Sequence, residues 1–480
     1  MSSALPFRFT KIIATLGPAT NSVEKIEELA NLGINVCRMN FSHGDHAFHG
    51  QTIKNVKAVN KKGHSLALML DTKGPEVRTG DVKEPLVITK GDLVTFTPRD
   101  LTGKEKSKTV KVNYDFFARD AKNARCIIID NGSIEMTLVK IEKDTVIAKA
   151  LDGGKIGSRR HVNLPGAYIS LPSFTDKDWK DIKFGIDQNV DFFAPSFVRS
   201  GDDIRELKEF LKKHKCDAHI MAKIETPQAV TNIDDIITES DAIMVARGDL
   251  GSEVPFEDVP GIQDDIVRKC RKAGKPVLVA TQMLESMILN PTPTRAEVTD
   301  IAYAAKSQAD CTMLSGETAN GMYPMKAVAA MDTVLRKCER IEPTYDLLID
   351  ASDDETKDID LPRREQALSA SVLATKLDAD AIVVISKHGK TALAVSNCRP
   401  LVHIHAFTET EDSQRRLSLV WGVSAHCIKF SDNNPDKTIA DAIARGKKEG
   451  FFKKGQRIVA VSDIRSADER VSTIQIRTIV

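Results

Sequence analysis

Residues 242–251 read AIMVARGDLG. The first five residues are apolar, as expected of a strand buried in the middle of a parallel sheet. Arg247, Gly248 and Asp249 follow directly, with no turn residues between them and the apolar run. A buried strand can end in such residues if its carboxyl end opens into a binding site. That arrangement is typical of a (β/α)8 barrel, whose strands point their carboxyl ends at one shared site.

The sequence on either side of this stretch repeats the same pattern. Eight short apolar runs alternate with segments of helical periodicity, and each run ends in polar or charged residues. The expected strands are 9–17, 35–41, 66–72, 191–197, 219–225, 242–249, 276–283 and 311–317. Helices are expected at 22–33, with Asn21 or Ser22 as the cap, at 202–215 and at 256–274. Eight such units predict an α/β fold with a closed (β/α)8 TIM barrel.

Two further domains are expected. Residues 74–171 break the β–α alternation and read as short strands separated by Gly, Asn and Asp, which predicts an inserted β-barrel-like lid domain after the third strand. An acidic connector, TYDLLIDASDDETKDIDLP (344–362), precedes a second α/β alternation. We therefore predict a catalytic barrel from 1–73 and 172–343, a lid from 74–171 and a C-terminal α/β regulatory domain from 344–480.

Composition narrows the class of protein. The 480 residues carry 68 Lys and Arg against 67 Asp and Glu, a net charge of +1, which gives no support for a nucleic-acid or membrane partner. The eight cysteines stand singly, with no CxxC pair, which fits a reducing compartment. The start of the chain lacks the pattern of a signal peptide, and no apolar run is long enough to span a bilayer. We expect a soluble cytoplasmic protein.

Polar residues at the ends of the expected strands suggest a site that binds a metal ion and an anion. Glu225 and Asp249 end neighbouring expected strands, and two carboxylates without nearby His or Cys favour a hard divalent ion such as Mg²⁺. The alternative is that they form salt bridges with Lys223 and Arg247. Lys223 lies on the same side of its strand as Glu225, where a lysine is uncommon unless it meets an anion. Arg38 either contacts an anion or braces the barrel through a buried ion pair.

At these strand ends the sequence resembles the pyruvate kinase family, and plastid-type and some bacterial members in particular. The resemblance rests on nine motifs that occur in the family's order over nearly the whole chain. They are KIIATLGPAT, CRMNFSHG, DTKGPEVRTG, VNLPG, AKIET, VARGDLG, ATQMLESM, PTRAEVTD and MLSGETANGMYP. The family transfers a phosphoryl group from phosphoenolpyruvate to ADP in the final step of glycolysis, giving pyruvate and ATP.

The resemblance implies roles for individual residues. Glu225 and Asp249 would hold Mg²⁺ or Mn²⁺, Lys223 would stabilise the phosphoryl group in transfer, and Arg38 would clamp the phosphate. The backbone amides of Gly248 and Asp249 would bind the substrate carboxylate. Thr281, which otherwise reads as an ordinary strand residue, would help a water molecule to protonate the enolate.

The family also implies a K⁺ site and a nucleotide site. Glu76 is the residue that potassium-dependent members carry, and the K⁺ ligands would be Asn40, Ser42, Asp71 and Thr72. No P-loop or protein-kinase glycine loop is present. Phosphates of ADP or ATP would instead bind the lid and the barrel through Asn40, His43, Arg78 and Arg160.

A last implied site lies in the C-terminal domain. The stretch Ser386, Lys387, His388, Gly389, Lys390 and Thr391 joins an expected strand to a helix and resembles the loop that binds the phosphate of an allosteric sugar phosphate. An ordinary turn is the alternative. Family members are usually homotetramers, and Arg247 would either orient neighbouring acids or contact an adjoining subunit.

Two other functions remain open at this point. A Mg²⁺-dependent aldolase or lyase acting on pyruvate would share the Glu225–Asp249 pair but would need neither the lid nor Lys223. A barrel retained only for metabolite sensing would be expected to have lost part of the site. Arg38, Lys223, Glu225, Asp249 and Thr281 are all present, which favours the kinase.

Overall fold

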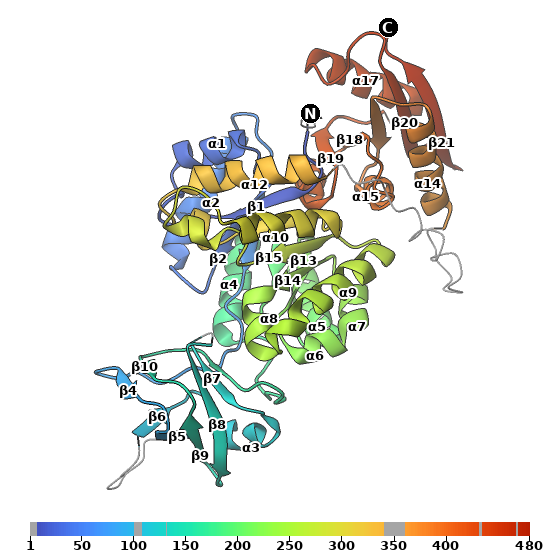
Figure 1. Cartoon of the computed structure of the whole chain (residues 1–480). Coiled ribbons are helices and arrows are strands. Elements are labelled where there is room, and N and C mark those ends of the chain that lie inside the picture. The colour runs from blue at the N-terminus through green and yellow to red at the C-terminus, as the bar shows by residue number, and fades with distance from the viewer. Residues whose placement is uncertain (1–6, 100–107, 131, 340–360, 432–433, 467–468) are drawn as a thin grey trace.

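The computed structural model describes residues 7–99, 108–130, 132–339, 361–431, 434–466 and 469–480. Figure 1 shows a central barrel with a β domain on one side and the C-terminal domain on the other. The expected boundary at residues 343 and 344, and residues 344–360 of the acidic connector, lie outside the described residues. No described helix is long and apolar enough to cross a membrane.

The central part is a closed barrel of parallel strands, which confirms the predicted fold. Its strands neighbour one another in the order β1-β16-β15-β14-β13-β12-β3-β2, and β2 pairs with β1 to close the ring. The strands are β1 (Lys11–Thr15), β2 (Val36–Asn40), β3 (Ala67–Asp71), β12 (Phe192–Ala194), β13 (His219–Ile224), β14 (Ala242–Ala246), β15 (Val277–Ala280) and β16 (Cys311–Leu314).

Helices surround this ring. They are α1 (Val23–Asn31), α2 (His46–Asn60), α4 (Asp176–Asp187), α5 (Gly201–Lys213), α6 (Pro227–Thr231), α7 (Ile233–Glu239), α8 (Arg247–Glu253), α9 (Val259–Lys272), α10 (Arg295–Lys306), α11 (Gly316–Ala319) and α12 (Pro324–Cys338). The Ser22 side chain accepts a hydrogen bond from the Lys25 amide and caps α1, so Ser22 is the cap and not Asn21. Gly33 ends this segment at φ +95°, a conformation that favours glycine.

The expected strands extend too far at their carboxyl ends. The strand candidate 242–249 is wrong beyond Ala246, because the backbone turns there (φ −92°, ψ 79°) and Arg247 begins the short helix α8. Gly248 and Asp249 therefore lie in the first turn of a helix rather than at the tip of a strand. Only the apolar residues Ala242–Ala246 form part of the buried barrel wall, and Arg247, Gly248 and Asp249 lie beyond the end of the strand, at the rim of the barrel.

Alternation along the strands separates two layers of the core. One set of side chains packs between the strands and the helices, including Ile12, Leu68 and Ile243. The alternate set, including Val36, Met69 and Met221, forms a second cluster that fills the barrel interior. On β2, β3 and β13, the interior position two residues further along is polar. This parity places Arg38, Asp71 and Lys223 inside the barrel at its carboxyl end.

The β domain lies between β3 and β12 in the sequence, as predicted. Its main sheet has the order β11-β7-β8-β9-β5-β6, and β10 pairs with β4 in a separate two-stranded sheet. The elements are β4 (Leu86–Ile88), β5 (Leu93–Thr97), β6 (Lys108–Lys111), α3 (Phe117–Asp120), β7 (Ile127–Ile129), β8 (Ile134–Ile141), β9 (Val146–Ala150), β10 (Gly154–Ile156) and β11 (Val162–Asn163). A compact apolar cluster around Phe96 and Phe117 gives this domain its own core.

The C-terminal domain is a five-stranded sheet with helices, in the order β19-β18-β17-β20-β21. Among the described residues of this sheet, β20 and β21 pair antiparallel and the other neighbouring strands pair parallel. The elements are α14 (Leu361–Lys376), β17 (Ala381–Ile385), α15 (Lys390–Asn397), β18 (His403–Thr408), α16 (Glu411–Arg416), β19 (Val423–Cys427), α17 (Pro435–Lys448), β20 (Arg457–Ser466) and β21 (Glu469–Thr478).

A buried ion pair joins this domain to the amino-terminal end of the barrel. Arg399 Nη2 lies 3.0 Å from Asp310 Oδ2, and both side chains are buried. Arg399 also donates to the Gln308 carbonyl, and Asp310 accepts from the amides of Val277 and Trp421. The Asp310 charge is therefore satisfied from both domains at once.

We predict that Arg399→Met lowers the free energy of unfolding by about 3–5 kcal/mol, because it leaves the Asp310 carboxylate buried without its partner. Denaturant unfolding followed by circular dichroism measures the change. The double variant Arg399→Met/Asp310→Asn should recover part of the loss. A loss below 1 kcal/mol in the single variant would contradict the assigned role.

Candidate active site

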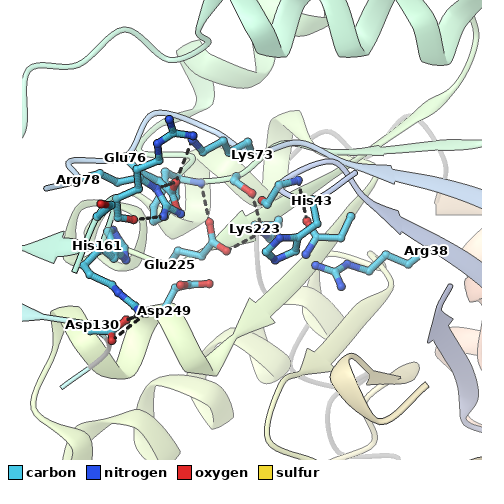
Figure 2. Close-up of a pocket in the computed structure, with 17 residues that line it drawn as sticks. Arg38, His43, Lys73, Glu76, Arg78, Asp130, His161, Lys223, Glu225 and Asp249 are labelled. Carbon is cyan, nitrogen blue, oxygen red and sulfur yellow. Dashed lines mark hydrogen bonds and ion pairs between the residues drawn. The ribbon is translucent and has the colours of Figure 1, made fainter. Parts of the chain in front are cut away.

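A cavity of about 290 Å³ opens at the carboxyl end of the barrel, beneath the β domain. Figure 2 shows residues from the barrel and from the β domain converging on it. Many of the residues expected at the site line this cavity: Arg38, Asn40, Ser42, His43, Arg78, Arg160, Lys223, Glu225 and Asp249. The structure thus brings together side chains that lie more than 200 residues apart in the sequence.

Asp71 links the two central cations. Its carboxylate lies 2.7 Å from Arg38 Nε and 3.1 Å from Lys223 Nζ, and it is almost completely buried. Burial would raise the pKa of Asp71, but Arg38 and Lys223 outweigh burial and lower it. Arg38 is further fixed by a hydrogen bond from Nη1 to the Thr15 hydroxyl. Arg38 is therefore both a cavity residue and a member of a buried ion pair.

Lys223 is held on several sides. Its ammonium donates to Ser196 Oγ at 2.6 Å and lies 2.8 Å from Glu225 Oε1. Burial alone would lower the pKa of Lys223, but Asp71, Glu225 and Asp249 outweigh it and raise the pKa. The side chain is therefore a fixed positive charge facing the cavity.

The negative charge of Glu225 is less well neutralised than that of Asp71. Its Oε2 accepts from the Phe197 amide at 2.6 Å, whereas Oε1 accepts no aligned hydrogen bond although Lys223 lies close to it. The pKa of Glu225 is raised to about 8, with burial as the largest cause, Lys223 opposing the rise and Asp249 adding to it. Figure 2 places Asp249 beside Glu225 in the cavity. Two neighbouring carboxylates, one of whose buried oxygens has an ion-pair partner but no aligned hydrogen bond, fit a divalent cation.

The protein supplies few ligands for such an ion. Within the described ranges, no group of three or more His, Cys, Asp or Glu has a geometry that would hold a metal. Mg²⁺ often binds through one or two carboxylates and completes its shell with water and substrate phosphate oxygens. The Glu225–Asp249 pair fits this mode and does not fit a closed structural metal site.

The residues expected to hold K⁺ occupy adjacent strand ends. Asn40 and Asp71 face each other in the register of β2 and β3. Asn40 Oδ1 accepts from the Ser42 amide at 3.1 Å, and Thr72 Oγ1 accepts from the Ser196 amide at 3.1 Å. Asn40 and Ser42 line the cavity, while Asp71 and Thr72 are buried behind it.

The β domain contributes its own charges to the cavity. Arg78 pairs with Glu76 at 2.6 Å and donates to the Arg159 carbonyl. Arg160 pairs with Asp130 at 3.2 Å. Both guanidinium groups line the cavity and are partly exposed, so an anionic ligand can reach them, and Figure 2 shows Arg78 next to Glu76.

Thr281 has a strained backbone. Its φ is +67°, which is rare for a β-branched residue, and Gln282 follows at +55°. The Thr281 hydroxyl donates to the Ala280 carbonyl at 2.6 Å and accepts from the Gly248 amide at 2.8 Å. Gly248 and Thr281 do not themselves line the described cavity, but they adjoin Asp249, which does. The Gly248 amide is thus engaged by Thr281 in this arrangement.

Arg247 holds this strained turn. It forms two hydrogen bonds to the Asp300 carboxylate of α10, at 2.6 and 2.7 Å, and donates to the Thr281 carbonyl at 2.7 Å. The salt bridge with Asp249 that the sequence left open does not form; the acid that Arg247 contacts is Asp300, within the same chain. The fork geometry of arginine suits this double role.

Several of the residues that line the cavity were not predicted from the sequence. Ser196, Lys73, Asp130, Arg159 and His161 all line the cavity. Ser196 follows the fourth barrel strand, so the rule that polar residues at strand ends face the site would have found it. Asp130, Arg159 and His161 come from the β domain, whose placement over the barrel gives no local signal in the sequence.

The fold and cavity define a (β/α)8 barrel protein whose cavity, at the carboxyl end of the strands, is lined by cationic and carboxylate side chains from the barrel and from the β domain. Comparison with known proteins agrees. The family model described as pyruvate kinase, barrel domain, matches residues 7–328, and the pyruvate kinase, alpha/beta domain, matches residues 365–477. The chain belongs to the pyruvate kinase family.

Individual relatives support this membership. Plastidial pyruvate kinase 2 of Arabidopsis thaliana is 43% identical over 95% of this chain and 78% of its own length. Pyruvate kinase of Dictyostelium discoideum is 40% identical over 95% of this chain and 91% of its own length. The solved structure of a pyruvate kinase from Cryptosporidium parvum aligns with a TM-score of 0.91, at 35% identity, over 98% of this chain and 96% of that one. The expected likeness to plastid-type and bacterial members is confirmed.

We predict that Asp300→Asn lowers kcat by about 10- to 100-fold with little change in KM, because a loosened Arg247 no longer fixes Thr281. Steady-state kinetics measure both constants. Asp264→Asn is the control, since Asp264 is an exposed carboxylate of α9 that accepts a hydrogen bond from Tyr303, a residue of the same helix α10 as Asp300. Equal kcat for Asp300→Asn and the unmodified chain would contradict the prediction.

Proposed function

We propose that this chain is an active pyruvate kinase, which moves the phosphoryl group of phosphoenolpyruvate to ADP and forms pyruvate and ATP. The observation that carries the proposal is the Arg38–Asp71–Lys223 network, placed beside Glu225 and Asp249 in one cavity. An aldolase or lyase would not require the lid arginines or Lys223, and the family membership does not favour it.

Charge and position supply most of the catalysis in phosphoryl transfer. Arg38 and Lys223 would bind the phosphoryl oxygens from the barrel side, and Arg78 and Arg160 would bind the nucleotide phosphates from the lid side, with Asn40 and His43 nearby. The lid would exclude water from the transferring group. Glu225 and Asp249 would hold Mg²⁺ or Mn²⁺, which supplies further positive charge to the phosphate when bound.

Protonation of the enolate completes the reaction. The Thr281 hydroxyl is already a donor to its neighbouring carbonyl and an acceptor from Gly248. It is therefore better suited to position a water molecule than to give up its own proton. The substrate carboxylate would lie against the first turn of α8, where the backbone amides and the helix dipole favour an anion.

We also propose K⁺ as a second cofactor, held by oxygens of Asn40, Ser42, Asp71 and Thr72. Glu76 supports this requirement: it lies in the cavity within 2.6 Å of Arg78 and 3.8 Å of Lys73.

A homotetramer, a cytoplasmic location and a sugar-phosphate effector at residues 386–391 belong to the same proposal. In that loop, Ser386 Oγ accepts from the Thr391 amide at 3.3 Å, and Lys387 pairs with Glu409.

We predict that Lys223→Met lowers kcat by about 10³-fold, because the migrating phosphoryl group loses a fixed positive charge. A coupled assay measures pyruvate formed from phosphoenolpyruvate with and without ADP. Electron paramagnetic resonance of Mn²⁺ should still detect metal bound to the variant. Lys57→Met, which removes a lysine of the outer helix α2 that donates to the Gln188 carbonyl, is the control. Pyruvate formation by Lys223→Met at the normal rate would refute the mechanism.

We predict that replacing K⁺ with Na⁺ or Li⁺ at constant ionic strength lowers the rate at least about tenfold, which corresponds to 1.4 kcal/mol in the barrier. The Glu76→Lys variant should depend less on K⁺, because its ammonium adds a positive charge inside the cavity. The same coupled assay in the three chloride salts measures both effects. Equal turnover in all three salts would reject the K⁺ site.

A further inference from the structure

A side-chain hydrogen bond joins the β domain, or lid, to the barrel next to the candidate active site. The Asn163 amide nitrogen Nδ2 donates to Glu253 Oε1 at 2.5 Å. Asn163 belongs to β11 of the lid, and Glu253 is the last residue of α8 in the barrel. The bond therefore connects two structural units through residues that lie 90 positions apart in the sequence.

Both partners lie on elements that carry active-site residues. Glu253 comes one helical turn after Asp249 on α8, so the two carboxylates lie on the same side of the helix. Asn163 closely follows Arg160, which lines the cavity, and backbone hydrogen bonds pair the segment around Arg160 with the segment around Arg78. A shift of Asn163 relative to Glu253 would therefore move both lid arginines relative to Asp249.

The two buried polar groups depend on this bond. Asn163 is 1% exposed, and its Oδ1 is buried without a hydrogen-bond partner among the described residues. The pKa of Glu253 is raised to about 7, with burial as the largest cause, the hydrogen bond from Asn163 opposing the rise and the charge of Asp249 adding to it. A buried polar group that loses its partner is destabilising by more than an average hydrogen bond stabilises. Breaking this bond is therefore strongly unfavourable.

The other contacts around this bond are mainly apolar. A small cavity of about 60 Å³ lies beside Glu253, between Leu164 and Ile169 of the lid and Phe197 and Pro227 of the barrel. Apolar contact is non-directional, so it does not by itself fix the angle at which the lid meets the barrel. A hydrogen bond is directional and can fix that angle.

A separate contact fixes the base of the lid. Arg199, which follows β12, donates to the carbonyls of Ile169 and Leu171 at 3.0 and 2.7 Å. These residues belong to the segment through which the chain returns from the lid to the barrel. Asn163 lies earlier in the chain, in the main sheet of the lid. Two fixed points determine the orientation of a rigid unit, whereas one leaves it free to turn.

We propose that Glu253 is a positioning residue for phosphoryl transfer, because its hydrogen bond with Asn163 holds the lid arginines at the separation from Asp249 that the nucleotide requires. Glu253 does not line the active-site cavity, and it acts through α8 and β11. The inference rests on the proposed kinase function, in which ADP is the ligand that the lid and the barrel share.

Steady-state kinetics with ADP and phosphoenolpyruvate varied in turn test this role. Glu253→Ala should raise KM for ADP about tenfold or more, because it removes a hydrogen bond to a buried carboxylate. KM for phosphoenolpyruvate, which the barrel binds, should change less than about threefold. Glu253→Gln should keep KM for ADP near normal, because its amide oxygen still accepts from Asn163. Glu257→Ala, which removes an exposed glutamate just after α8, is the control and should change neither constant.

A paired substitution tests the contact from the lid side. Asn163→Asp places two carboxylates against each other and should weaken ADP binding about tenfold or more. Adding Glu253→Gln to that variant should restore most of the affinity, because the glutamine amide can donate to the new carboxylate. Isothermal titration calorimetry of ADP with Mg²⁺, without phosphoenolpyruvate, measures these affinities independently of turnover.

The outcomes separate this role from the kinase function. An unmodified chain that binds ADP but forms no pyruvate would refute the kinase function, and calorimetry on the variants would still decide the role of Glu253. That role is overturned if Glu253→Ala binds ADP normally, if it raises both KM values equally, or if Glu253→Gln fails to rescue Asn163→Asp. Absence of ADP binding by the unmodified chain would overturn both. If circular dichroism shows that Glu253→Ala does not fold, Asn163→Ala replaces it, with the same expected loss of ADP affinity.

Discussion

The buried carboxylate of Asp71 is the constraint on which the candidate active site depends. Arg38 and Lys223 carry like charges inside a barrel of low polarity, and they can lie this close only because Asp71 lies between them. The carboxylate fixes both side chains in position and neutralises one of the two charges. The remaining positive charge faces the cavity, where an incoming phosphate would complete the neutralisation.

The carboxylates of Glu225 and Asp249, on the other side of the cavity, need a cation in the same way that Arg38 and Lys223 need an anion. Glu225 is fully buried and lies next to Asp249, and its pKa is raised mainly by burial, with a further contribution from the charge of Asp249. Cations on one side and carboxylates on the other give the cavity a charge separation across a short distance. Substrate phosphate and a divalent ion together would satisfy both sides. This explains why phosphate and metal binding are expected to support each other.

Strain is confined to one turn of the rim. Thr281 and Gln282 adopt left-handed backbone conformations, and Arg247 and Asp300 hold the turn from the side of α10. The stretch AIMVARGDLG (242–251) therefore has three parts with different structural roles. Its apolar residues form the barrel wall, Arg247 supports a neighbouring strand end, and Asp249 lines the cavity from the first turn of a helix, next to Gly248.

The sequence by itself determined the barrel, the place of the inserted β domain and most residues at the strand ends, because the alternation of apolar residues is a local property that survives without coordinates. It could not supply the end of β14 at Ala246, since a helix turn and a strand tip look alike over three residues. Only the tertiary structure decided that Arg247 contacts Asp300, that Asp130 and His161 reach the cavity, and that Asn163 contacts Glu253. Each of these depends on how separate units pack, and packing between distant segments has no periodic signal along the chain.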